Sequence, residues 1–142
     1  MEISDIKRRV VETIERSKRH AAERRARNDA AAREYQAFLS GIAIPVFRQV
    51  SNVLRVQGYP FTVFTPGGTA GNVRLMSDRS AEDFIELALD TSGDTPVVSA
   101  HTGRGRGGRV TEVEEPIGPP ATLTENDVLS FLLKALEPLV ER

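Results

Sequence analysis

The sequence contains no cysteine and no tryptophan, and only 2 of its 142 residues are histidine. The absence of cysteine excludes a disulfide framework, a thiolate zinc site and a cysteine nucleophile. Two histidines without a clustered acidic pattern make a poor metal site. No serine, histidine and acid share the sequence context of a nucleophile elbow. We therefore expect no metal, no other cofactor and no enzymatic activity.

Long apolar runs are also missing. No stretch approaches the roughly 18 consecutive apolar residues that are typical of a membrane-spanning helix. The opening segment, MEISDIKRRVVETIERSKRH, lacks the apolar core of a signal peptide. We expect a soluble, cytoplasmic protein without membrane contact. Its length of 142 residues suits a single folding unit with its own core.

What the sequence does contain is one extended helical pattern at its start. Placed at intervals of about 100°, fifteen positions from Ile3 to Val53 fall on a single stripe. Both ends of the stripe are aliphatic, whereas its middle, around Ala21 and Asn28, is small or polar. Alanine, arginine and glutamate keep this middle helical although it buries little area. The pattern predicts a long helix whose middle stands away from the body or meets another helix through small residues.

Two residues interrupt this helical pattern. Gly41 weakens the helix and Pro45 removes a backbone donor, which predicts a kink or break near these positions. Pro45 equally suits the first turn of a second helix that runs to Gln57. We accordingly divide the chain into an extended helical arm or coiled-coil segment, residues 1–40, and an α+β globular body, residues 41–142.

After Gly58 the period of the pattern changes from helical to two. Segments 59–65 and 73–77 alternate around a glycine-rich turn at 66–72, and together they predict a hairpin. Segment 83–91 is compatible with a helix or a strand. We favour a strand, because its larger apolar side chains alternate with small or charged ones.

The second half of the chain predicts the rest of an α+β fold. Segments 95–102 and 109–115 complete an antiparallel meander of four or five strands. Thr124 and Asp127 form a capping box that starts the last helix. The apolar residues of that helix cover more of its circumference than one sheet face can hide. We expect it to pack on the sheet and to keep an apolar surplus at its surface.

The stretch HTGRGRGGR, from His101 to Arg109, has two interpretations. Four glycines within residues 103–108 are expensive in entropy to order, which predicts a mobile, exposed connection whose arginines make no contact needed for folding. The alternative is an anion site. Glycines free the backbone N–H groups to form a concavity, and arginines close over phosphate with bidentate hydrogen bonds.

The helical stripe and the apolar surplus favour a non-enzymatic oligomerising, assembly or adaptor subunit. Its partner would be itself, as a homodimer or higher oligomer, or a larger protein complex. Asn28 either lies in a helix seam, where asparagine sets register and oligomeric state, or is exposed. The predicted interface residues are Ile14, Ala21, Asn28, Tyr35, Leu39, Leu129, Leu133 and Leu136.

The alternative function is nucleic-acid binding by an accessory protein. Between Arg16 and Arg33 the chain holds seven basic and two acidic residues, which is one sign of a polyanionic partner. The basic side chains encircle the helix, however, as in a solvated helix with ion pairs four residues apart. For nucleic-acid binding, the predicted residues are Lys18, Arg19, Arg24, Arg25, Arg27, Arg104, Arg106 and Arg109.

Overall fold

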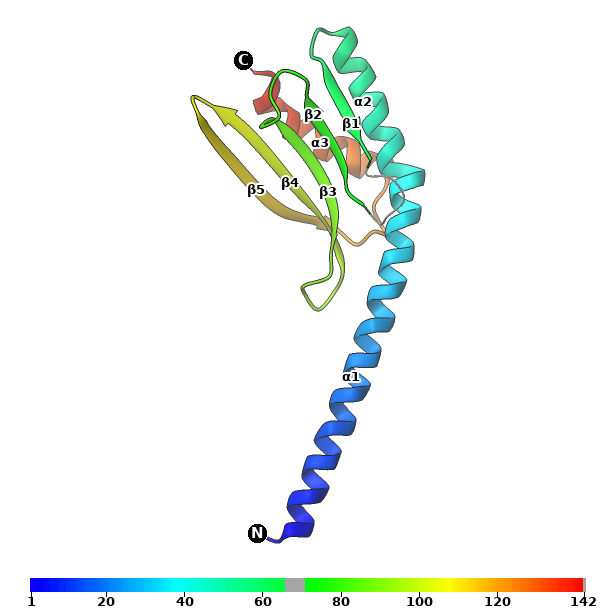
Figure 1. The fold of residues 1–142 in the computed structure, drawn as a ribbon. Helices are drawn as coiled ribbons and strands as arrows, with labels where there is room; N and C mark the ends of the chain where they lie inside the picture. Colours follow the sequence, from blue (N-terminus) through cyan, green and yellow to red (C-terminus); the bar gives the residue numbers. More distant parts are fainter. Residues whose placement is uncertain (66–70, 142) are drawn as a thin grey trace.

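The structure, a computed structural model, describes residues 1–65 and 71–141. One long helix leads into a five-stranded sheet and a last helix (Figure 1). The elements are α1 Ile3–Phe38, a π-helical turn η1 Leu39–Ala43, α2 Ile44–Val56, β1 Phe61–Phe64, β2 Val73–Ser77, β3 Phe84–Asp90, β4 Val97–Arg106, β5 Arg109–Gly118 and α3 Glu125–Val140. The predicted α+β class is confirmed. Most of the turn predicted at 66–72 lies outside the described residues.

The sheet is the predicted meander. Its strands follow the order β1-β2-β3-β4-β5, and every neighbouring pair is antiparallel. Leu87 of β3 lies opposite Val73 on one side and Ala100 on the other. These three residues belong to one buried cluster with side chains of all three helices. The helices therefore cover one face of the sheet and leave the other face open (Figure 1). Segment 83–91 is a strand, as favoured.

A π-helical turn takes the place of the predicted kink or break. The backbone N–H of Ile44 donates to the oxygen of Leu39, five residues back, and α2 begins with Pro45 in its first turn. Proline cannot donate to the residue four positions earlier, and its ring clashes with that carbonyl. A wider turn accommodates both constraints. The chain therefore stays helical from Ile3 to Val56.

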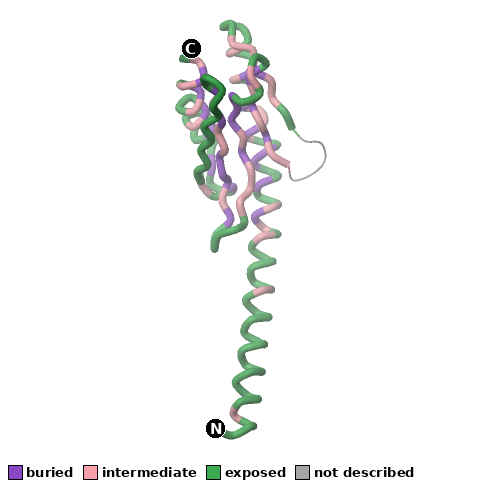
Figure 2. Tube along the Cα trace, turned by 60° about the vertical axis from the view of Figure 1, so that its left-hand side comes forward, coloured by how far each residue is buried: buried purple, intermediate pink, exposed green. Residues whose placement is uncertain are grey.

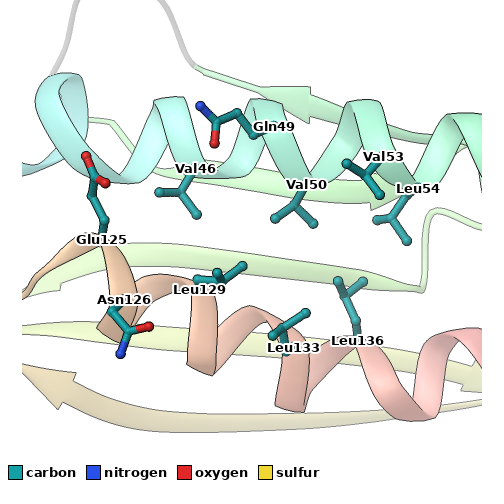
Figure 3. Close-up of a pocket in the computed structure, with 10 residues that line it drawn as sticks. All are labelled: Val46, Gln49, Val50, Val53, Leu54, Glu125, Asn126, Leu129, Leu133 and Leu136. Carbon is teal, nitrogen blue, oxygen red and sulfur yellow. The ribbon is translucent and has the colours of Figure 1, made fainter.

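The π turn also rotates the residues that follow it. One extra residue in a turn changes the helical phase by about 100°. Tyr35 and Phe47, both fully buried, consequently lie on the same side of the helix, against the sheet. Val50 and Val53 are turned away from that side, toward α3 (Figure 3). The single stripe predicted through Val53 is thus continuous only as far as η1.

The first part of α1 projects beyond the body (Figures 1 and 2). Ala31 is the first residue of the chain to be buried, at 6% exposure, and Tyr35, Phe38 and Leu39 follow it into the core. We call the projecting segment Ile3–Ala30 the arm. Burial of α1 therefore starts at Ala31, within the segment 1–40 that the sequence pattern assigned to the helical arm.

By length and composition, the helical run Ile3–Val56 contains one 18-residue window that is apolar enough to cross a membrane, and 33% of that window is buried in the fold. The core helix of a soluble protein and a signal sequence near an N-terminus both pass the same test. The location of the protein therefore stays a prediction.

The glycine-arginine stretch is not the mobile connection that its composition predicted. Strand β4 continues to Arg106 and β5 starts at Arg109. Only Gly107 and Gly108 form the turn, with φ values of 60° and 81°. Positive φ at both central residues is the requirement of a tight two-residue hairpin turn.

The other two glycines of the stretch are ordered by contacts with the chain just before and at the start of β3. A Cβ atom on Gly103 would lie 2.2 Å from Cε1 of Phe84 and 2.8 Å from the backbone oxygen of Glu82. The N–H of Gly105 donates to Oδ1 of the buried Asp83 at 2.9 Å. These contacts offset the entropy of ordering glycine. The prediction of mobility was wrong because it considered the stretch without its neighbouring strand.

The Phe84 contact makes Gly103 a sensitive position. Gly103→Ala must displace the Phe84 ring or the backbone of Glu82, and overpacking of this kind costs about 1–3 kcal/mol. We expect a melting temperature several degrees below that of the unchanged chain. Gly93→Ala is the matched control, because no atom lies within 4 Å of its Cβ position and its φ is not positive. Equal melting temperatures for the two variants would contradict the packing described here.

Candidate functional site

The arm carries an exposed aliphatic stripe. Ile6, Val10 and Ile14 lie on the same side of α1 and are 46%, 51% and 47% exposed. The predicted interface residues Ala21 and Asn28 follow on the same side and are half-buried. No described residue of the body covers this part of the helix (Figure 2). The arm therefore presents an apolar side that its own chain leaves open to solvent.

Three predicted interface residues belong to the core of the chain, and one of them, Leu136, also lines the groove between α2 and α3. Tyr35, Leu39 and Leu136 are buried within their own body. The Tyr35 hydroxyl lies 3.2 Å from the backbone oxygens of both Leu87 and Gly71, so its proton has a buried acceptor. Burial, and to a lesser degree the charge of Glu86, raises the pKa of Tyr35 well above its usual range, which keeps that proton in place.

The burial of Tyr35 and Leu39 could not be predicted from the helical pattern. An apolar stripe looks the same where it meets its own sheet and where it projects into solvent. Residues 35 and 39 continue the stripe of Ile14 and Ala21 without a change of period. Only the position of the sheet separates the buried part from the exposed part.

An apolar groove runs between α2 and α3 (Figure 3). It has a volume of about 520 Å³. The predicted interface residues Leu129 and Leu133 line it and stay exposed, at 37% and 58%. Across the groove, Val50 and Val53 face them from α2, in the orientation that the π turn gives them (Figure 3). The apolar surplus predicted for the last helix is thus gathered on one side of the body.

The basic residues of the arm lie in solvent. All five that were predicted to bind nucleic acid are exposed: Lys18, Arg19, Arg24, Arg25 and Arg27. Within the arm, the only ion pair among the described residues joins Arg8 to Asp5 at 3.3 Å. The expected pairs four residues apart are absent. This fits the small energy of exposed ion pairs, which rarely hold two long side chains in one geometry.

The three hairpin arginines come together on one side of the sheet. Arg104 lies opposite Thr111, and Arg106 lies opposite Arg109. Because side chains two residues apart share a face, all four point to the face on which Ala100 is buried. They line a hollow of about 290 Å³ near the hairpin tip. None of the three guanidinium groups has an ion-pair partner among the described residues.

The structure does not bring the two halves of the predicted nucleic-acid surface together. The tip of the β4–β5 hairpin lies at the end of the body that is remote from the arm (Figure 1). The basic helix and the arginine hairpin are therefore separate features, and each requires its own explanation.

The open face of the sheet carries a polar cluster that no pattern in the sequence predicted. Arg74 pairs with Glu86 and stacks over the Phe84 ring, 4.1 Å from its centroid. His101 packs edge-on against the same ring, with the centroids 5.1 Å apart. Phe84 is consequently 4% exposed although no helix covers it. The cluster covers the Phe84 ring. The described residues contain no group of three or more acidic or histidine side chains suited to a metal.

Comparison of the chain with protein-family models, with curated proteins and with solved structures finds no match.

The unpaired arginines of the hairpin lead to a prediction about stability. Arg106 and Arg109 are like charges directly opposite each other, an arrangement that destabilises a hairpin. Replacing Arg104 and Arg106 together by serine should therefore leave the free energy of unfolding within about 0.5 kcal/mol. Thermal and urea unfolding measure this change. Arg74→Ser is the contrasting variant, because it breaks contacts with Glu86 and Phe84, and we expect it to lower the melting temperature. A large loss of stability in the hairpin variant alone would contradict this account.

Proposed function

We propose that the protein is a non-enzymatic assembly subunit that self-associates through its arm, with two copies packed antiparallel. The observation that carries the proposal is the exposed aliphatic stripe of Ile6, Val10 and Ile14 on the arm, which the body does not cover. A row of exposed aliphatic side chains on one side of a projecting helix is a typical feature of a protein contact. Helices in water owe most of their stability to packing of an apolar side, which the arm lacks in a single copy.

The position of the body favours the antiparallel orientation. Tyr35 and Leu39 continue the stripe of the arm, and they are buried by the body. The body therefore occupies the stripe side of the helix above Ala30, and the space on that side is free only beside the arm (Figures 1 and 2). A second helix running parallel in the same register would bring its body into the space of the first. An antiparallel helix places the two bodies at opposite ends.

The charge distribution along the arm supports the same orientation. Residues 1–15 hold three basic and four acidic residues, whereas residues 16–33 hold seven basic and two acidic residues. A parallel pair would place the strongly basic segment beside its own copy. An antiparallel pair places it beside the slightly acidic one. Complementary charges of this kind set the orientation of paired helices more than their affinity.

The length of the arm gives the register of the pair. A segment from Ile3 to Ala30 is about 40 Å long at the helical rise. Full overlap of two such segments places the two-fold axis between Arg16 and Ser17. In this register the aliphatic residue Val10 of one copy lies beside Arg24 of the other, whose aliphatic stem covers apolar surface while its charged end reaches water.

A pair of neighbouring valines tests the role of the stripe. Val10 lies on it, and Val11 is turned away by about 100°, while both are exposed, at 51% and 42%. Val10→Lys places a second positive charge beside Arg24 of the other copy, so we expect it to reduce the mass measured by light scattering from that of a dimer to the monomer's 15.6 kDa. Val11→Lys should leave the dimer largely intact. Equal masses for the two variants would show that the stripe is not the contact.

Cross-linking tests the orientation, and the chain suits it because it has no cysteine of its own. A disulfide needs Cα atoms within about 7 Å. In the antiparallel pair, two copies of Val10→Cys lie about 20 Å apart. A mixture of Val10→Cys and Arg24→Cys chains should therefore form a mixed disulfide on mild oxidation. Efficient formation of the Val10→Cys homodimer disulfide instead would establish parallel arms and overturn the orientation.

A further inference from the structure

The arginine hairpin concentrates positive charge without compensation. Arg106 and Arg109 are directly opposite each other across the strands, and Arg104 follows two residues along the same face. Like charges in such cross-strand positions are unfavourable. Within residues 1–65 and 71–141, no ion pair joins these arginines to a carboxylate. Glu82 lies over Gly105 on the other face, and the Oδ1 atom of Asp83 accepts the N–H of Gly105.

One donor among the arginines that line the hollow is buried. The Nε atom of Arg104 is buried and has no hydrogen-bond partner among the described residues. An unsatisfied buried donor on a charged group is costly, and native structures rarely retain one without a reason. The hydroxyl of Thr111 adds a second kind of donor at the wall of the same hollow. The site therefore offers several donors and positive charge, and no carboxylate is among the residues that line it.

We propose that the hollow formed by Arg104, Arg106, Arg109 and Thr111 binds the phosphate group of a small ligand. Planar guanidinium groups match the oxygens of phosphate with two parallel hydrogen bonds each, which ammonium groups cannot do. A bound phosphate satisfies the Nε atom of Arg104 and neutralises the opposed pair. The volume of about 290 Å³ is close to the lower end of small-molecule pockets.

A nucleic-acid backbone offers the same phosphate chemistry, but the surroundings favour a small ligand. Strands of nucleic acid are bound along extended basic grooves that contact several phosphates. The hairpin arginines form one compact cluster, and the exposed glutamates of β5, Glu112 and Glu114, lie beside it on the opposite face. The basic arm lies at the other end of the molecule (Figure 1).

Calorimetric titration of the full chain with inorganic phosphate and with inorganic pyrophosphate tests the proposal. We expect saturable binding to the unchanged protein, and a loss of affinity of at least about tenfold in Arg106→Gln. Arg104→Lys keeps the positive charge but replaces the planar guanidinium by an ammonium group. A loss of phosphate affinity similar to that of Arg106→Gln indicates that Arg104 binds phosphate with two parallel hydrogen bonds. Arg48→Gln removes an equally positive, exposed side chain on α2 and should bind as the unchanged protein does.

A second readout protects the test against variants that fold poorly. Pyrophosphate should raise the melting temperature of the unchanged chain, since a ligand that binds the folded state stabilises it. Arg106, which is exposed, can be changed without removing a buried group. Equal weakening by Arg48→Gln, or no saturable binding of either anion, overturns the proposal. Tight binding of a single-stranded oligonucleotide without binding of pyrophosphate overturns it in favour of a polymer.

Discussion

Alignment of Tyr35 with Phe47 on one side of a continuous helix is the constraint on which the architecture depends. Tyr35 comes before η1 in the chain and Phe47 comes after it, and both rings are fully buried. The extra residue of the π turn rotates the helix so that both rings face the sheet. Without it, the aliphatic residues of α2 would face the sheet and Phe47 would not. The π turn therefore fixes three features together: the packing of the body, the groove between α2 and α3, and the side on which the arm presents its stripe.

In a single chain, the arm leaves aliphatic side chains exposed to water, and the β4–β5 hairpin leaves positive charge without an ion pair among the described residues. The arm exposes aliphatic side chains that water disfavours, and the arm of a second copy would cover them with its alanines and the aliphatic stems of its arginines. The hairpin holds three guanidinium groups that form no ion pair with any described residue, and an oxyanion relieves that charge. The two features lie at opposite ends of the molecule (Figure 1). A self-associating chain with a ligand site in each body is consistent with both.

The sequence predicted the element types well where one period continued over many residues. The long helix, the meander and the capping box at Thr124 were all visible in it, and the capping box is present with both of its hydrogen bonds. The π turn was not predictable from periodicity, because Gly41 and Pro45 fit a kink equally well. The buried state of Tyr35 and Leu39 was not predictable either, because a stripe carries no mark of where the sheet covers it. The hairpin was different. In residues 103–106, GRGR, glycine and arginine alternate as the residues of a strand do. The glycines face Phe84 and Glu82, and the arginines face the hollow. The high glycine content favoured a loop and led to the wrong prediction.

Hydrogen exchange of the backbone amides in the arm tests the central claim most directly. An unpaired helix in water opens readily, whereas a helix buried against a second copy is protected by the stability of the pair. At high protein concentration, we predict that amides between Ile6 and Ala30 exchange far more slowly than those of an isolated helix of the same sequence. Rapid exchange throughout the arm, in a sample whose β3 and β4 amides remain protected, would contradict the account.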